Sequence, residues 1–387
     1  MSNFAFSRDI YGLNSFINKY YLDEYIASGG SKIKFLTGST GSGKSYFLSL
    51  NKESAKEMGY MTVNFSAKNV PLYDFKELYV EIIKQIDIDK IFHKCANKTI
   101  TNLGYDINNI APNVSFNDYL SSQNELNAIT KKALRDELKH MFLDNPLMDH
   151  NFALACSLLT GSILGHPTLD EVDKDIIYRW LMADKSLRVP MIKNIGLAPI
   201  KITKINARHM LRSLLEILIL AGYKGLAVYI DDLDVVLNKS GLDEIHYTKN
   251  RREDMYELIR QLIDDIDSLR NIFFVFAFNN SLLFDEAKGI KSYQALWFRI
   301  QNEIVSNRFN YFSDIINLDK YALQFYNVDT IQNMLKDIIS KEINKYNNVP
   351  ELDENRINEI KTLASNGALG IPALLKDMAN KDAKGEN

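Results

Sequence analysis

Apolar residues in this chain of 387 residues fall into two kinds of segment: short runs and longer stretches with helical spacing. Short apolar or alternating runs bounded by turns are typical of strands, and continuous runs are typical of strands inside a parallel sheet. Such runs occur at residues 32–37, 61–66, 225–230, 272–278 and 314–318. Because helical stretches separate them, we predict an α/β fold with a parallel sheet.

The helical stretches predict how the chain is divided. Helices next to the strands are predicted at residues 45–58, 207–221 and 251–267. Residues 72–204 are almost wholly helical in pattern, most clearly at 124–144 and 169–187, and three further helices are predicted at 328–346, 354–365 and 371–379. We therefore expect a first part of the core (1–71), a helical insertion (72–204), a second part of the core (205–320), a helical lid (321–380) and a flexible tail (381–387).

Residues 38–45, Gly-Ser-Thr-Gly-Ser-Gly-Lys-Ser, match the phosphate-binding P-loop pattern G-x-x-x-x-G-K-[ST] in full. They lie between a predicted strand and a predicted helix, which is the context that this loop needs. Its glycines let backbone N–H groups surround phosphates, and the helix directs its positive end at the same anion. The residues predicted to bind ATP are Gly38, Ser39, Thr40, Gly41, Ser42, Gly43, Lys44 and Ser45.

Two of these residues have particular roles. Lys44 brings a positive charge to the β- and γ-phosphates, and the Ser45 hydroxyl is a predicted ligand of Mg²⁺. A chance glycine-rich turn is the alternative interpretation of the whole motif.

Two acids follow the strand predicted at 225–230. Asp231 and Asp232 stand at its carboxyl end, where open α/β sheets place their ligands. Asp231 is predicted to hold Mg²⁺ through water, and Asp232 to act as the general base for the attacking water, with Asp234 as the next candidate. Many hydrolytic P-loop enzymes carry Glu at the second position, so the shorter Asp232 predicts slow hydrolysis. A solvated acidic turn is the alternative.

Asn279 and Asn280 follow the strand predicted at 272–278, which we expect between the P-loop strand and the acidic strand. In AAA+ ATPases a polar residue at this place, called sensor 1, orients the attacking water. Asn279 is the first candidate and Asn280 the second. A simple turn that caps the next helix is the alternative.

The order of elements is AAA+-like: a P-loop NTPase core with a large helical insertion and a C-terminal helical lid. Lys44 and Asp231 are 187 positions apart, further than a compact core needs. Such sites usually take an arginine from a neighbouring subunit to stabilise charge in the transition state. Arg299 and Arg308 lie between the last two predicted strands, and Arg308 is better placed; a surface arginine is the alternative.

The lid departs from the usual pattern at one position. Ala373 stands where an arginine, the sensor 2 residue, is usual in AAA+ proteins. That cation is therefore missing, unless Lys376 substitutes for it.

Composition narrows the class of protein. A net charge of −3 with 25% charged residues does not point to nucleic acid, although a local basic patch is compatible with it. Cys95 and Cys156 are too few for a disulfide framework and, like the six His, lack metal-ligand spacing, so we expect buried thiols and no structural metal. We find no signal peptide and no apolar stretch long enough for a membrane span, so we expect a soluble cytoplasmic protein.

Five segments resemble the BREX-associated P-loop ATPases of BrxC/BrxD type: residues 205–211, 221–226, 230–234, 255–267 and 289–300. The likeness covers residues 30–320 and is weakest in the helical insertion. It implies an AAA+/ASCE ATPase that uses ATP and Mg²⁺ in a bacterial anti-phage system. The expected partners are a second copy or a homologous ATPase, other defence proteins, and DNA, bound directly or through those proteins; a membrane is not expected.

Three functions remain open. The first is an ATPase that oligomerises and remodels a partner complex on DNA. The second is a scaffold gated by nucleotide, with little or no hydrolysis; Asp232 and Ala373 favour it. The third is an initiator ATPase of replication or transposition, which usually adds a winged-helix DNA reader after the lid, and residues 380–387 leave no room for one.

Overall fold

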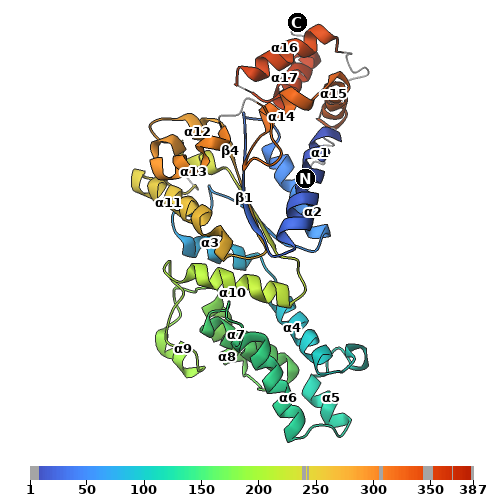
Figure 1. Ribbon diagram of the computed structural model, residues 1–387, viewed down its shortest axis with the longest axis vertical. Coiled ribbons are helices and arrows are strands. Elements are labelled where there is room, and N and C mark those ends of the chain that lie inside the picture. The colour runs from blue at the N-terminus through green and yellow to red at the C-terminus, as the bar shows by residue number, and fades with distance from the viewer. Residues whose placement is uncertain are drawn as a thin grey trace.

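The structure is a computed structural model that describes residues 8–237, 241, 244–304, 308–342, 352–367 and 369–384. Within these ranges five strands form one parallel sheet in the order β2-β3-β4-β1-β5 (Figure 1). The strands are β1 (Ser31–Gly38), β2 (Met61–Ser66), β3 (Leu226–Asp231), β4 (Ile272–Asn279) and β5 (Ile315–Asn317). The mixed α/β fold is confirmed, and each strand lies within one residue of its predicted bounds.

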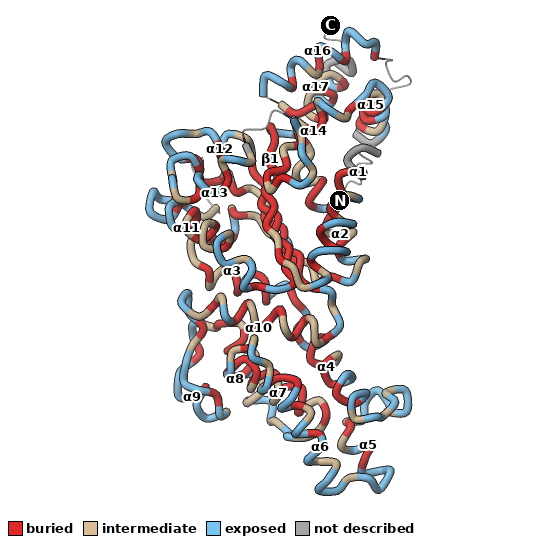
Figure 2. Tube along the Cα trace, viewed as in Figure 1, coloured by how far each residue is buried: buried red, intermediate tan, exposed pale blue. Residues whose placement is uncertain are grey.

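The sheet separates two apolar cores, because successive side chains of a strand point to opposite faces. Val228, Phe274 and Phe276 belong to one core, and Tyr229 and Phe273 to the other. The first core is covered by α3 (Phe75–Lys84), α10 (Ala207–Leu220), α11 (Lys249–Asp265), α12 (Ser281–Phe284) and α13 (Gln294–Ile304). The second is covered by α1 (Arg8–Phe16), the π-helical segment Ile17–Ile26, α2 (Lys44–Glu57) and the C-terminal helices. Coverage on both faces explains the continuous apolar runs of β1, β3 and β4, which are buried along almost their whole length (Figure 2), whereas the edge strand β2 is partly exposed.

The predicted insertion is helical in the structure. Its helices are α3, α4 (Ile88–Asn102), α5 (Phe116–Ser122), α6 (Ala128–Leu138), α7 (His150–Leu164), α8 (Glu171–Leu181) and α9 (Val189–Asn194). Side chains of Asp74, Asp87, Asp149 and Asp170 accept backbone N–H groups at the starts of α3, α4, α7 and α8, which fixes where these helices begin. Cys95 on α4 and Cys156 on α7 are buried, as expected.

Some helices differ from the prediction. The single helix predicted at 124–144 begins only at Ala128, because Asn127 and Thr130 form a capping box, and it passes into a π-helical turn at Lys139–Leu143. The helix at 169–187 is the shorter α8, and the N-terminal helices before residue 27 were not predicted.

Four helices follow β5: α14 (Leu318–Phe325), α15 (Val328–Glu342), α16 (Glu354–Ser365) and α17 (Ile371–Lys384). Only three helices are predicted after the last strand; α14 is the one missed, because it follows β5 without an intervening loop. Helix α17 runs to Lys384, into the segment predicted as a flexible tail, and residues 385–387 lie outside the described residues. In Figure 1 these helices lie at the end of the molecule opposite α5–α9. Of the helices described, none combines the length and apolar character that crossing a membrane requires.

Candidate functional site

The glycine loop, residues 38–45, joins the end of β1 to the start of α2. Gly41 and Gly43 have φ angles of 72° and 98°, a region that favours glycine. A Cβ atom on Gly38 would lie 2.4 Å from the Ser42 Oγ, and one on Gly41 would lie 2.4 Å from the Ala373 Cβ. The loop is therefore wound so closely that glycine is required at these positions.

Lys44, the first residue of α2, folds back over this loop. Its Nζ donates hydrogen bonds to the carbonyl oxygens of Gly38 (3.1 Å) and Ser39 (2.9 Å) and to the Asn279 Oδ1 (2.7 Å). Burial lowers the pKa of this ammonium, while the carboxylates of Asp234 and its acidic neighbours act to raise it. The glycine loop thus holds a partly desolvated cation at the carboxyl edge of the sheet.

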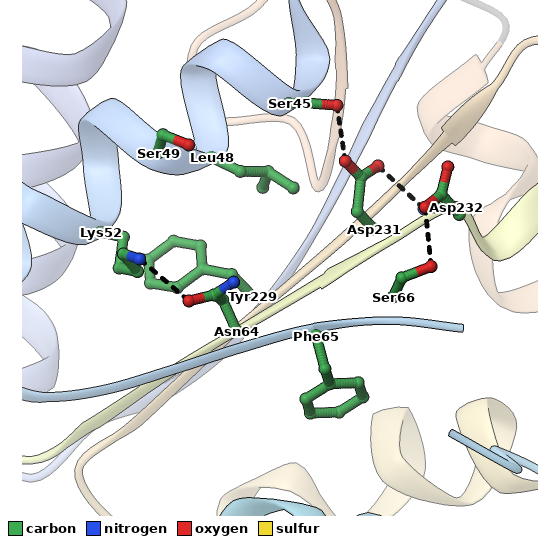
Figure 3. Close-up of a pocket in the computed structure, with 10 residues that line it drawn as sticks. All are labelled: Ser45, Leu48, Ser49, Lys52, Asn64, Phe65, Ser66, Tyr229, Asp231 and Asp232. Carbon is green, nitrogen blue, oxygen red and sulfur yellow. Dashed lines mark hydrogen bonds between the residues drawn. The ribbon is translucent and has the colours of Figure 1, made fainter. Parts of the chain in front are cut away.

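Ser45 and Asp231 meet at the same edge although 186 positions separate them. The Ser45 hydroxyl donates to the Asp231 Oδ2 at 2.6 Å (Figure 3). Burial raises the pKa of Asp231, and the hydrogen bond from Ser45 opposes this rise. Both side chains line a cavity of about 240 Å³, whose other lining includes Lys52 and Asn64. The predicted pair of metal ligands therefore faces open space.

Asp232 turns away from this pair. Its φ is 58°, and its backbone N–H donates to the Asp231 Oδ1 at 2.8 Å. Its carboxylate accepts the Ser66 hydroxyl at 2.7 Å and pairs with the Lys68 ammonium at 3.2 Å. Although burial acts to lower it, these contacts with Asp232 raise the pKa of Lys68. The predicted base is therefore held toward the β2 side of the sheet.

Asn279, rather than Asn280, contacts Lys44. The Asn279 Nδ2 donates to the Asp234 Oδ2 at 2.7 Å and its backbone N–H donates to the Asp234 Oδ1 at 3.0 Å. The two hydrogen bonds orient the amide so that its oxygen faces Lys44. The Asn280 side chain instead accepts the Thr37 hydroxyl at 2.8 Å and donates to Asp319 at 2.8 Å. Since β4 lies between β3 and β1, Asn279 stands between the glycine loop and the acids, as predicted.

The C-terminal helices hold the start of the glycine loop. The Asp319 Oδ2, on α14, accepts the backbone N–H of Ser39 at 2.6 Å and the Ser39 hydroxyl at 2.7 Å. Thr40 forms an isolated bridge with Leu369, and the Gly370 N–H donates to the Thr40 carbonyl at 3.0 Å. No cation stands at the start of α17 at position 373, because that residue is Ala.

The two predicted arginines lie outside this group. Arg299 on α13 donates from Nε and Nη2 to the Asp264 carboxylate, at 3.0 and 2.9 Å, so it ties α13 to α11. Arg308 lines a second cavity, of about 260 Å³, together with Asn280 and Lys320.

Sequence reasoning missed three residues of the site: Asp319, Ser66 and Lys68. Asp319 had a signal, since it closely follows the last strand, as Asp231 ends β3. Ser66 ends β2 and meets Asp232 because β2 pairs with β3. Asp231 and Asp232 are selected because polar residues at the carboxyl ends of parallel strands lie near the ligand. The same rule, applied to every strand, also selects Asp319 and Ser66. Lys68 lies beyond β2 and has no such signal.

The residues present fit a magnesium nucleotide. Mg²⁺ is usually held by one or two protein oxygens together with phosphates and water, and Ser45 with Asp231 offers such a pair. The described residues contain no cluster of three His, Cys, Asp or Glu side chains suited to a metal, and this kind of site needs none. The Ser42 Oγ is buried in the glycine loop without a hydrogen-bond partner, which leaves one polar atom of the loop for a ligand.

A model of the family described as "BREX system ATP-binding protein BrxC/D" matches residues 11–370. The chain belongs to this family. The match includes the glycine loop, the acids after β3 and the helical segment between them, where the resemblance is weakest. It makes the chain an ATP-binding protein of a BREX defence system, and its fold is consistent with an α/β NTPase. Neither the curated proteins nor the solved structures gave a match.

Proposed function

We propose that the chain binds ATP with Mg²⁺ through an AAA+-type P-loop, hydrolyses it slowly, and couples nucleotide state to the assembly or remodelling of a BREX complex on DNA. The observation that carries this proposal is the contact of Ser45 with Asp231, beside Lys44 folded over the glycine loop. Three groups with matched chemistry, a phosphate cation and two magnesium ligands, converge at one sheet edge.

Each residue has a defined task in this proposal. Lys44 and the N-terminus of α2 bind the β- and γ-phosphates. Ser45 and Asp231 position Mg²⁺, which when bound neutralises charge on the phosphate oxygens. Asp232 accepts the proton of the attacking water once its carboxylate has left Ser66 and Lys68. The amide of Asn279 orients that water and keeps Lys44 in place.

The first experiment separates binding from turnover. Lys44→Ala removes the phosphate cation and should weaken ATP binding by about 2–4 kcal/mol, measured by calorimetry. Lys56→Ala, an exposed residue further along α2 that does not line the cavity, is the matched control and should keep wild-type affinity. Asp232→Asn should still bind ATP while turnover falls about 100-fold or more. Equal ATP affinity of wild type and Lys44→Ala would refute the P-loop assignment.

A second function, a scaffold gated by nucleotide, has its own support. Both oxygens of the Asp232 carboxylate are engaged away from Ser45, and Ala373 occupies the position nearest Gly41 where a cation is usual. In that case ATP orders the C-terminal helices through Ser39 and Thr40 without rapid hydrolysis. Absence of turnover in the wild type, with DNA and the other BREX proteins added, would favour the scaffold over the ATPase.

We also propose that ATP drives association with a second copy or with a homologous ATPase, whose Arg308 completes the site. A finger arginine acts on charge in the transition state, so Arg308→Ala should bind ATP normally and hydrolyse it slowly. Subunits with Asp232→Asn and an intact Arg308 should restore turnover when mixed with Arg308→Ala subunits. A protein that stays monomeric with ATP at high concentration, alone and with its partners, would refute this assembly.

A further inference from the structure

A basic segment lies in the helical part of the molecule, apart from the nucleotide site. Between Asp184 and Glu216 the chain carries seven Lys and Arg residues and no Asp or Glu, whereas the whole chain has a net charge of −3. The segment comprises the end of the α8–α9 connection, α9, the loop that follows it and most of α10. Figure 1 shows α9 and this loop along one flank of the molecule. The positive charge of this segment therefore contrasts with the slightly negative charge of the whole chain.

Part of this charge is used inside the fold. Arg208 pairs with Asp265, Arg212 donates to the Leu147 carbonyl at 3.0 Å, and Lys185 pairs with Glu77 at 3.1 Å. The remaining exposed cations are Arg188, Lys193 and Lys204. Among the contacts described for this part of the chain, these three have no ion pair. Their charge is therefore available to an external anion.

A cavity of about 350 Å³ has Lys204 in its lining and is itself basic. Lys76, Lys185, Lys201 and Lys204 line it. Its two acids already have partners: Asp74 accepts the Lys76 N–H at the start of α3, and Asp184 pairs with Arg179 at 2.7 Å. The bond from Arg179 lowers the pKa of Asp184 to about 2, so this acid stays ionised and paired. The cavity thus presents more positive than negative charge.

Part of the cavity wall is apolar and fixed in place. The buried Trp180 forms part of the wall, and its Nε1 donates to the Ile200 carbonyl at 2.8 Å, which anchors the loop before α10. Ile200 and Ile205 do not line the cavity, but they flank its lining residues 201–204 in the chain and are 56% and 85% exposed. Isoleucine beside Arg and Lys is the combination by which proteins contact the sugars and base steps of the minor groove. Residues 185–206 contain no aromatic residue on which single-stranded bases could stack.

We propose that this basic segment, with its exposed Arg188, Lys193 and Lys204 and its lysine-lined cavity, binds the phosphate backbone of duplex DNA. The proposal specifies how the chain takes part in the proposed action on DNA, but it does not depend on ATP hydrolysis. Exposed cations whose neighbouring acids are already paired within the protein are complementary to a regular line of phosphates. The surface predicts binding that depends strongly on salt and weakly on base sequence.

The test is fluorescence anisotropy with a labelled 30-base-pair duplex between 50 and 200 mM salt. The variant Arg188→Gln, Lys193→Gln, Lys204→Gln removes the three available charges and should bind at least about tenfold more weakly. Its slope of log affinity against log salt should become shallower by about one for each phosphate that the variant no longer neutralises, about three in all. The wild type should also prefer this duplex to a single strand of the same length.

The matched control is Lys131→Gln, Lys132→Gln, Arg135→Gln on α6, which changes the net charge equally and should bind DNA like the wild type. An equal loss of affinity in the control would overturn the proposal, as would wild-type affinity in the triple variant or no binding by the wild type at 50 mM salt. Equal binding to polyglutamate would assign the surface to an acidic protein instead. The triple variant should bind ATP with wild-type affinity in calorimetry. A loss of DNA binding can therefore be distinguished from damage to the nucleotide site.

Discussion

The ion pair between Lys68 and Asp232 predicts that removing the lysine accelerates ATP hydrolysis. Asp232 acts on water near the nucleotide only after its carboxylate leaves Lys68 and Ser66. The Lys68→Met variant keeps most of the side-chain volume and removes one of the two partners that hold the carboxylate on the β2 side. The cost of turning Asp232 should therefore fall, and with it the barrier to turnover.

The geometry limits the size of the effect. The two charges lie 3.2 Å apart, but the side chains of Lys68 and Asp232 are 40% and 37% exposed. Exposed pairs of this kind contribute about 0.2–1 kcal/mol, so turnover should rise about 1.4- to 5-fold. Ser66→Ala, which removes a hydrogen bond to the same carboxylate, should act in the same direction.

The assay is phosphate release at saturating ATP, with ATP affinity measured separately. Lys224→Met is the matched control, because it breaks another exposed lysine–aspartate pair, with Asp23 at 3.0 Å, that does not border the cavity of Ser45 and Asp231. Turnover in Lys68→Met that equals or falls below the wild-type rate, at unchanged ATP affinity, would refute the reasoning. Asp232 would then be either already in its working orientation or not the base.

Three further perturbations have defined outcomes. Gly370→Ala places a Cβ 2.4 Å from the Ser42 Cα, so ATP affinity should fall and the free energy of unfolding should drop by about 1–3 kcal/mol. An ATP affinity equal to that of the wild type, measured by calorimetry, would contradict this. Burial lowers the pKa of Lys34 from 10.5 to about 8. Between pH 8 and pH 10.5 the unfolded chain therefore binds more protons than the folded chain, so this lysine makes the free energy of unfolding rise with pH. Lys34→Met should remove this contribution, up to about 1.4 kcal/mol per pH unit in urea unfolding from pH 8 to 10, and an identical slope in both proteins would disprove it. Arg299→Ala breaks an exposed pair with Asp264 and should cost at most about 1 kcal/mol while turnover persists; loss of turnover would instead make Arg299 the finger.

Much of the sheet was predictable from the sequence because its strands are covered on both faces. The continuous apolar run at 272–278 predicts an inner strand, and the structure places β4 between β3 and β1. The glycine loop was predictable for a related reason, since Gly38 and Gly41 admit no side chain. Local sterics and local hydrophobicity determine both features, and both are visible in a single sequence.

Contacts between distant segments were less accessible. The sequence shows acids at 231 and 232, but their opposite orientations depend on the positive φ of Asp232 and on its contacts from the neighbouring strand. Asp319 reaches Ser39 only because β5 pairs with β1 and α14 starts directly after β5. The π-helical segments at Ile17–Ile26 and Lys139–Leu143 were missed because i→i+5 hydrogen bonding is rare and no residue pattern marks where it replaces the α-helix.

The strand order has a consequence for synthesis on the ribosome. β1 pairs only with β4 and β5, and β2 pairs with β3, so the first two strands made are not partners of each other. After Ser66 emerges, 165 further residues must be translated before Asp231 completes β3, which takes roughly 10–30 s at typical rates. The intervening helices pack largely against one another, α4 on α7 for example, and can form during that interval. The nascent chain therefore carries β1 and β2 unpaired until β3 and β4 have been made. A chaperone that shields these two strands would raise the yield of folded protein more than it would for a sheet built from consecutive hairpins.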